Sequence, residues 1–276
     1  MLYLILGASG QVGSALCDHY FEKGDSIETF DIASAPHEDL RLKSNSILRK
    51  KFERSDFVFF LAFDVGGSRY LKKYQKSFDF LQNNMKIMVN TFELLKETKK
   101  PFIFTSSQMS NMHFSSYGTL KRLGEHYTES LGGLVVKFWN VYGIETNLEK
   151  SHVITDFIIK ARDKGVINML TDGDEFRQFL HVEDCCRCLD ILSQKYATLD
   201  RKENYHISSF QTHCVHGVAS LVAKNFPHTV PVIKGEARDC VQGGGQSESP
   251  DRYILNFWEP KISLKEGIKR MYDYYV

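Results

Sequence analysis

Residues 2–13 read LYLILGASGQVG, a short apolar run followed by three glycines, Gly7, Gly10 and Gly13, spaced three residues apart. The apolar run predicts a buried strand, and the glycines predict a tight turn into a helix that begins near Gln11. A helix N-terminus presents unpaired N–H groups and the positive end of its dipole, so it binds a pyrophosphate when no side chain blocks the approach. The stretch therefore predicts a dinucleotide site.

A carboxylate follows at the end of the next apolar strand. Asp31 lies eighteen residues after Gly13 and ends the strand expected at 26–30. There it would accept hydrogen bonds from the adenosine ribose hydroxyls and repel the 2′-phosphate of NADP. Ile32 and Ala33 come next, where a basic residue would have favoured NADP. We therefore expect NAD as the cofactor; the alternative is a glycine turn and a strand-end acid that are unrelated.

Composition and charge exclude several classes of function. The chain has 276 residues with 35 basic and 34 acidic side chains, a balance that creates no field for nucleic acid or a membrane surface. Apolar runs stay well short of the ~20 residues that span a bilayer. Met1 leads directly into the first strand, so we expect no signal peptide and a cytoplasmic protein.

The six cysteines are unevenly spaced along the chain. Cys185, Cys186 and Cys188 fall in one helical stretch, where small buried thiols are the ordinary interpretation. We expect neither a disulfide nor a metal site.

The first half of the chain alternates strand-like and helix-like patterns. This alternation predicts an α/β fold of Rossmann type, a doubly wound parallel sheet covered by helices. We expect strands at 2–6, 26–30, 57–62, 102–106 and 134–138, and helices near 12–23, 45–52, 78–98 and 117–131.

The pattern changes after Gly143, which predicts a smaller C-terminal lobe that binds substrate. There we expect helices over 147–164 and 182–195, a short strand at 168–170, a turn at 172–174 and a loop over 235–250. The expected division is an NAD-binding Rossmann domain made of 1–143 with 176–205, and a small substrate-binding lobe made of 144–175 with 206–276.

Candidate catalytic residues follow the fourth strand. The strand at 102–106 delivers Ser106 and Ser107 to the carboxyl end of the sheet, where ligands bind in open parallel sheets. Tyr117 and Lys121 come next, and residues four apart on a helix share one face. A free phenol titrates near pH 10. We expect the ammonium of Lys121, helped by the positive nicotinamide ring, to lower the pKa of Tyr117 so that the phenol removes a substrate proton, aligned by Ser107.

These motifs, taken in order, resemble the extended short-chain dehydrogenase/reductase family, whose best-known members are nucleotide-sugar epimerases and dehydratases. The resemblance spans nearly the whole chain. Its motifs are GASGQVG at 7–13, Asp31, FLAF at 60–63, FTSS at 104–107, YGTLK at 117–121, NVYG at 140–143, FRQFLHVED at 176–184 and LNFWEPKISLKEGI at 255–268.

The resemblance implies a role for each matching position. The pyrophosphate would lie against Gly7, Ser9, Gly10, Gln11 and Val12, the ribose against Asp31 and Ile32, and the adenine against Asp39 and Leu40. Leu61, Ala62 and Phe63 would run under the cofactor, with Tyr117 and Lys121 beside it. The implied catalytic set is Ser107, Tyr117 and Lys121, and the implied contacts to a nucleotide-sugar substrate are Ser107, Asn140, Arg177 and Arg238.

Three of the substrate positions have alternatives. Arg177 could instead form a surface ion pair with Glu175 or Asp174. Asn140 could cap a turn. Arg238 is followed by Asp239-Cys240, which departs from the family pattern.

Other departures concern the chemistry. Sugar-nucleotide dehydratases carry an acid pair where this chain has Gln108 and Met109, which cannot transfer protons, so a 4,6-dehydratase is not expected. Position 108 also lacks the cysteine of GDP-mannose 3,5-epimerases. Only nine residues separate Ser107 from Tyr117, a shorter loop than the family usually has, and its one titratable residue is His113.

These features predict an NAD-dependent enzyme that modifies a nucleotide-activated sugar through a 4-keto intermediate, with 4-epimerisation as the leading activity. A 4-keto-sugar reductase or sugar dehydrogenase is the first alternative. A non-catalytic dinucleotide-binding protein is the second, although Tyr117 and Lys121 are both present. The family resemblance further implies a homodimer formed by the helices expected at 78–98 and 117–131.

Overall fold

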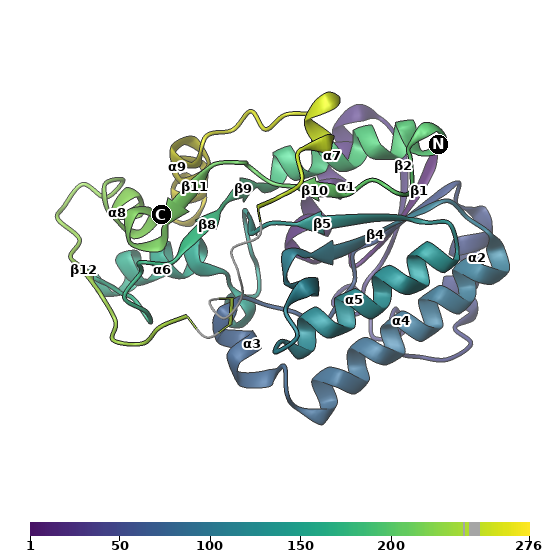
Figure 1. The fold of residues 1–276 in the computed structure, drawn as a ribbon, viewed down its shortest axis with the longest axis horizontal. Coiled ribbons are helices and arrows are strands. Elements are labelled where there is room, and N and C mark those ends of the chain that lie inside the picture. The colour runs from purple at the N-terminus through teal and green to yellow at the C-terminus, as the bar shows by residue number, and fades with distance from the viewer. Residues whose placement is uncertain (240, 243–248) are drawn as a thin grey trace.

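A computed structural model describes residues 1–239, 241–242 and 249–276. Its centre is a six-stranded sheet in the order β10-β5-β4-β3-β1-β2, and every strand pair in it is parallel (Figure 1). The strand order reverses between β1 and β3, so the crevice at their carboxyl ends is where a ligand of this fold binds. The strands are β1 (Leu2–Leu6), β2 (Ser26–Phe30), β3 (Phe57–Phe60), β4 (Phe102–Ser107), β5 (Leu134–Phe138) and β10 (Tyr205–Ile207).

Helices cover both faces of this sheet (Figure 1). Alternate residues of β1 show the two layers, because Tyr3 and Ile5 enter one apolar core and Leu4 and Leu6 the other. The first core is closed by α1 (Gln11–Lys23) and α7 (Val182–Lys195), and the second by α2 (Ser46–Arg54), α4 (Phe78–Thr98) and α5 (Ser116–Ser130). Burial on both faces explains why the central strands β1 and β3 are continuously apolar, whereas the edge strand β2 also carries polar residues.

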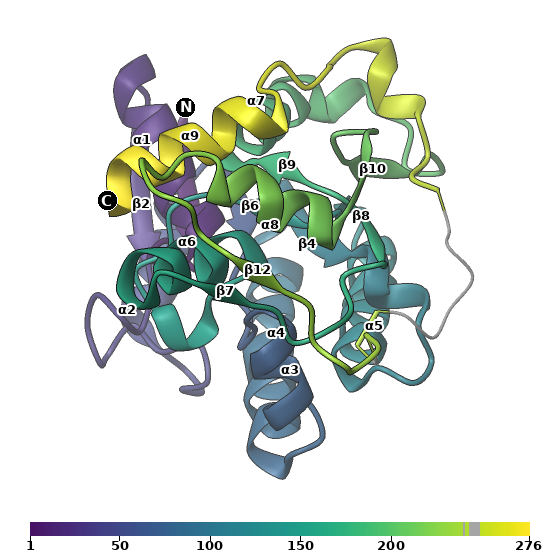
Figure 2. The same ribbon diagram turned by 90° about the vertical axis from the view of Figure 1, so that its left-hand side faces the viewer.

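A smaller lobe has a third apolar core. It consists of α6 (Val153–Lys164), α8 (Val215–Ala223) and α9 (Leu264–Tyr275), with β8 (Phe176–Gln178) paired to β11 (Thr212–Cys214) and β7 (Ile167–Asn168) paired to β12 (Val232–Ile233) (Figure 2). The short pair β6 (Val141–Tyr142) and β9 (Leu180–His181) connects this lobe to the sheet.

The sequence-based elements are largely confirmed, with differences that have local causes. Helix α6 begins later than expected, because Asn147 caps a separate 3₁₀ turn, Leu148–Lys150. Helix α3 (Ser68–Tyr74) was not predicted. The remaining 3₁₀ turns are Gln108–Asn111, Tyr196–Thr198 and Tyr253–Asn256.

Two segments lie apart from the division expected from the sequence. Strand β8 falls in the range assigned to the Rossmann domain, yet it pairs with β11 of the smaller lobe. The turn Tyr253–Asn256 falls in the range assigned to the smaller lobe, yet Ile254 and Trp258 are buried in the first core of the sheet. Residues 240 and 243–248 of the loop expected at 235–250 lie outside the described residues.

None of the helices in the described part of the chain combines the length and apolar character that crossing a bilayer requires.

The glycine turn predicts a specific stability defect. A Cβ on Gly13 would lie 2.0 Å from the carbonyl oxygen of Gly7, whereas a Cβ on Gly10 would lie at an acceptable 3.4 Å from the same atom. We expect Gly13→Ala to lower the free energy of unfolding by about 3 kcal/mol, because α1 must move off the turn. Gly10→Ala should cost about 1 kcal/mol or less. Urea denaturation of both variants measures the difference, and equal losses would contradict the assigned close contact.

Candidate active site

The turn between β1 and α1 leaves room for a phosphate. Gly7 has φ +88, and a Cβ on it would lie 2.7 Å from the backbone of Ala62, so the turn approaches the end of β3 closely. Gly10 is the N-cap of α1 and offers no side chain over the first turn. The side chain of Gln11 is drawn aside, since its Nε2 donates to the Gly143 carbonyl at 3.3 Å. These features fit the pyrophosphate of a dinucleotide.

Asp31 is held at the expected place beside this turn. Its carboxylate accepts hydrogen bonds from the backbone N–H groups of Ser9, at 2.9 Å, and Ala33, at 2.8 Å. A second carboxylate, on Glu38, accepts from the backbone N–H of Asp31 at 3.1 Å and pairs with Lys51. Sequence reasoning missed Glu38. Asp31, whose carboxylate forms none of the ion pairs found among the described residues, suits ribose hydroxyls and opposes a 2′-phosphate, whereas the charge of Glu38 is balanced by Lys51.

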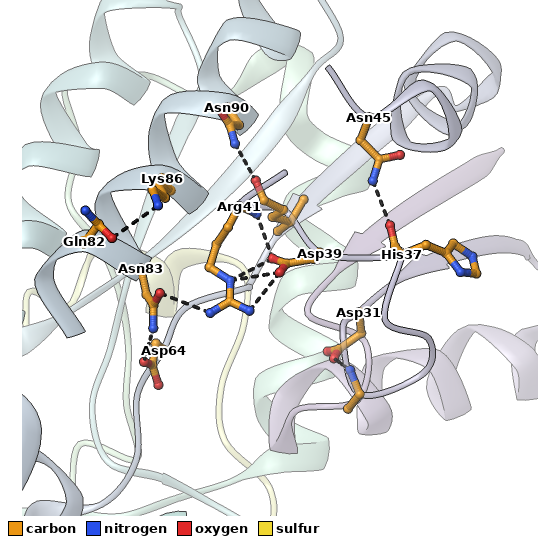
Figure 3. Close-up of polar contacts among 12 residues, drawn as sticks. Asp31, His37, Asp39, Arg41, Asn45, Asp64, Gln82, Asn83, Lys86 and Asn90 are labelled. Atoms are coloured by element: carbon orange, nitrogen blue, oxygen red, sulfur yellow. Dashed lines mark hydrogen bonds and ion pairs between the residues drawn. The ribbon is translucent and has the colours of Figure 1, made fainter. Parts of the chain in front are cut away.

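Arg41 is an unpredicted partner of Asp39, one of the two residues expected at the adenine (Figure 3). The carboxylate of Asp39 accepts hydrogen bonds from the backbone N–H and the guanidinium of Arg41, and Arg41 also donates to Asn83 at 3.1 Å. Burial acts to raise the pKa of Asp39, but the bonds from Arg41 outweigh it and lower that pKa. Leu40 is buried, and its carbonyl accepts from Asn90. The Asp39 carboxylate and the Arg41 guanidinium thus already engage one another.

The catalytic candidates lie together at the carboxyl end of β4. Ser107 ends that strand, and Tyr117 and Lys121 lie on the buried side of α5. Helix α5 packs closely against the turn that follows β4 because Gly118 has no side chain. A Cβ at this position would lie 2.0 Å from the Met109 carbonyl oxygen. The ring of Phe63 packs edge-on against the ring of Tyr117, with centroids 5.7 Å apart. The Lys121 Nζ lies 3.9 Å from the centroid of the Phe63 ring.

The expected lowering of the Tyr117 pKa is not found. Burial raises the pKa of Tyr117 to about 12, opposed by a hydrogen bond with Ser107. Burial lowers the pKa of Lys121 to about 7, and its Nζ donates to the Thr105 carbonyl at 2.7 Å. The part of the expectation that concerned Lys121 was wrong, because it counted the attraction between the two groups and omitted the loss of water around both. The part assigned to the positive nicotinamide ring stays a prediction.

An unpredicted carboxylate compensates part of this loss. Glu125 follows Lys121 by one turn of α5, is almost fully buried, and its charge raises the pKa of Lys121. Its Oε1 accepts from the Ser106 hydroxyl at 2.5 Å and lies 3.4 Å from the Lys137 Nζ. The spacing of Lys121 and Glu125 on one helix face could have indicated it.

The positions expected at the substrate are placed as follows. Asn140 has a positive φ of 36°, and its buried Nδ2 finds no hydrogen-bond partner within the described residues. Arg177 is paired with Asp239. The expected alternative partners are engaged elsewhere, Glu175 by Thr171 and Asp174 by Lys234.

The remaining expectations concern charge and sulfur. Arg238 and His113 are exposed. Among the residues that the structure describes, no group of three or more His, Cys, Asp or Glu side chains could hold a metal ion. Cys185, Cys186 and Cys188 are buried free thiols, whose pKa values burial raises.

Comparison with known proteins agrees with this geometry. Residues 3–208 match the NAD dependent epimerase/dehydratase family. The chain belongs to this family. It is therefore an NAD-dependent enzyme of a family whose members modify nucleotide sugars.

Individual relatives carry different names. GDP-L-fucose synthase 1 of Arabidopsis thaliana is 23% identical, over 99% of this chain and 92% of its own length. The fold of UDP-glucose 4-epimerase from Thermotoga maritima matches with a TM-score of 0.78 and 20% identity, covering 100% of this chain and 98% of the other. A GDP-6-OMe-4-keto-L-xylo-heptose reductase from C. jejuni matches with a TM-score of 0.81 and 20% identity, covering 99% and 97%.

The place of Asp31 predicts a change in cofactor preference. We expect Asp31→Asn to weaken NAD binding and to bind NADP more tightly than the unmodified enzyme does, since a repelling charge is lost. Fluorescence titration with both dinucleotides measures the ratio of dissociation constants, which should shift by about tenfold toward NADP. Asp56→Asn, a carboxylate at the opposite end of β1 that accepts from the Leu2 N–H, is the control. An unchanged ratio would count against the ribose role of Asp31.

The buried charge of Glu125 predicts a shifted pH profile. Removing it in Glu125→Gln lowers the pKa of Lys121 further, so the ammonium is lost at lower pH. If catalysis uses this ammonium, the limb of the kcat/KM profile that reports its loss moves down by about one pH unit. Glu129→Gln, an exposed carboxylate on the same helix, should leave the profile unchanged. Identical profiles for both variants would remove Glu125 from this role.

Proposed function

We propose that the enzyme inverts the C4 hydroxyl of a nucleotide-activated sugar through a 4-keto intermediate. The observation that supports this proposal most is the set of side chains at and directly after Ser107, near Tyr117. Ser107, Tyr117 and Lys121 form a set that can move the proton of a substrate hydroxyl, while NAD, when bound, would accept and return the hydride of the same carbon. The two positions after Ser107 hold an amide, Gln108, and a thioether, Met109, whose side chain is buried in the core. The site could thus support the interconversion of a hydroxyl and a keto group. Gln108 and Met109 lack the acid–base groups that dehydration needs.

The protein's own groups would act in a simple sequence. Tyr117 takes the proton of the C4 hydroxyl, and Ser107 aligns that hydroxyl. Because burial opposes the phenolate, its formation would need the charge of the nicotinamide ring in addition to the Lys121 ammonium. NAD, when bound, supplies reversible uptake of a hydride. Inversion requires the keto sugar to present its other face before the proton returns from Tyr117. The substrate must therefore be anchored by its diphosphate, for which we propose Asn140, Arg177 and Arg238.

A 4-keto-sugar reductase is the second candidate. The names of the relatives include both a 4-epimerase and a keto-heptose reductase. A reductase consumes reduced cofactor in each turnover, whereas an epimerase regenerates it. The carboxylate of Asp31 beside the glycine turn favours NAD and so supports the epimerase.

We also propose a homodimer. Helices α4 and α5 run side by side over one face of the sheet (Figure 1). Phe78, at the start of α4, is 71% exposed, and Tyr127 of α5 stacks on Phe92 at the edge of the same surface.

One experiment tests the activity. Purified enzyme with UDP-, GDP- and dTDP-hexoses in D₂O should interconvert C4 epimers without added cofactor and without deuterium at C3 or C5 of the product, as followed by proton NMR. Tyr117→Phe should lower kcat by about 10²–10⁴-fold. Tyr127→Phe, a substitution on the exposed side of the same helix, should leave kcat unchanged. Net consumption of added reduced cofactor would replace the epimerase by the reductase, and full activity of Tyr117→Phe would reject the catalytic assignment.

A further inference from the structure

The arginine proposed for the diphosphate is already paired with a carboxylate of the protein. Arg177 on β8 donates through its guanidinium to Oδ2 of Asp239, 62 residues further along the chain. The pair is largely removed from water, because the side chain of Arg177 is 16% exposed and that of Asp239 11% exposed. Salt and solvent screen partly buried ion pairs less than surface pairs, so a ligand that separates Arg177 from Asp239 must overcome their attraction.

The two oxygens of Asp239 have separate partners. While Oδ2 faces Arg177, Oδ1 accepts the backbone N–H groups of Val241, at 2.8 Å, and Gln242, at 3.2 Å. Oδ1 therefore shapes the local turn, and Oδ2 is the oxygen that neutralises Arg177. An asparagine can keep the first function with its own oxygen, and it places an N–H donor where the second was.

The same short segment is bonded to the residue that follows Ser107. Val241 is 3% exposed and belongs to the apolar core that includes Tyr117. The side chain of Gln242 accepts from Gln108, the residue after Ser107, at 3.2 Å. The pair of Arg177 and Asp239 is thus linked, through Gln242 and Gln108, to the end of β4 that carries Ser107.

A diphosphate is the ligand whose chemistry matches this pair. A guanidinium binds a phosphate in the same two-pronged way as a carboxylate, so a phosphate can replace Asp239 on Arg177. Arg238, exposed and without a partner within residues 1–239, 241–242 and 249–276, is adjacent in the chain and supplies a second cation. A neutral sugar or nucleoside offers nothing that would displace the carboxylate.

We infer that Asp239 is an internal counter-ion that occupies the diphosphate subsite on Arg177, and that its displacement sets the affinity for the nucleotide sugar. This inference rests on the proposed function. Because the pair must open before any complex forms, it weakens ground state and transition state alike. Asp239 therefore controls KM and leaves kcat unaffected.

The test compares Asp239→Asn with a matched control. The control is Asp174→Asn, which removes the same charge from the same lobe at an exposed pair with Lys234. Calorimetric titration with UDP, GDP, dTDP and inorganic pyrophosphate should show about tenfold tighter binding of at least one of them to Asp239→Asn, and no change for Asp174→Asn. The double variant Arg177→Ala/Asp239→Asn should lose the gain. Thermal unfolding and NAD titration of each variant confirm that the fold is intact.

The outcomes separate this inference from the proposed function. Tighter binding with a lower KM and unchanged kcat supports the counter-ion. Equal or weaker binding by Asp239→Asn, where the unmodified enzyme does bind a nucleoside diphosphate, overturns the counter-ion and leaves the proposed substrate class standing; weaker binding would make Asp239 a positioning residue for Arg177. Failure of every variant, Asp239→Asn included, to bind any of the four probes rejects the diphosphate subsite and the nucleotide-sugar substrate together.

Discussion

The close approach of helix α1 to the turn after β1 is the constraint on which the site depends. The backbone of Gly13 lies directly over the carbonyl of Gly7, and Gly7 itself lies against Ala62 at the end of β3. This contact aims the N-terminus of α1 at the crevice where the strand order reverses. It also brings the turn within hydrogen-bond distance of Asp31, whose carboxylate accepts from Ser9. The anion site and the ribose carboxylate thus have one common cause.

The catalytic end of the crevice is governed by desolvation. Tyr117 and Lys121 are both buried, and burial alone favours their neutral forms. A buried carboxylate partly offsets this effect at Lys121. It belongs to Glu125, which lies one turn away on the same helix and accepts a hydrogen bond from Ser106. Burial lowers the pKa of Lys121 to about 7, and the charge of Glu125 opposes that effect.

The substrate side shows a different use of charge. Arg177 comes from β8 and Asp239 from a distant loop, and the pair joins the smaller lobe to the segment beside Gln108. Because the cation is neutralised within the protein, its availability to a ligand becomes a matter of competition between two anions. Under the counter-ion inference, Asp239 sets the affinity for substrate without belonging to the proposed catalytic set.

The sequence by itself determined the Rossmann fold, the glycine turn, the family and the order of the catalytic motifs. These follow from local patterns: apolar runs fix strands, glycine spacing fixes the turn, and Tyr117 and Lys121 share a helix face at any tertiary arrangement. Tertiary structure alone decided the partners of charged groups. That Arg177 pairs with Asp239 and Asp31 is joined by Glu38, and that β8 crosses to the smaller lobe, are contacts between segments distant in the chain. The pKa values of Tyr117 and Lys121 belong to the same class, because the water excluded from a side chain is set by everything packed around it.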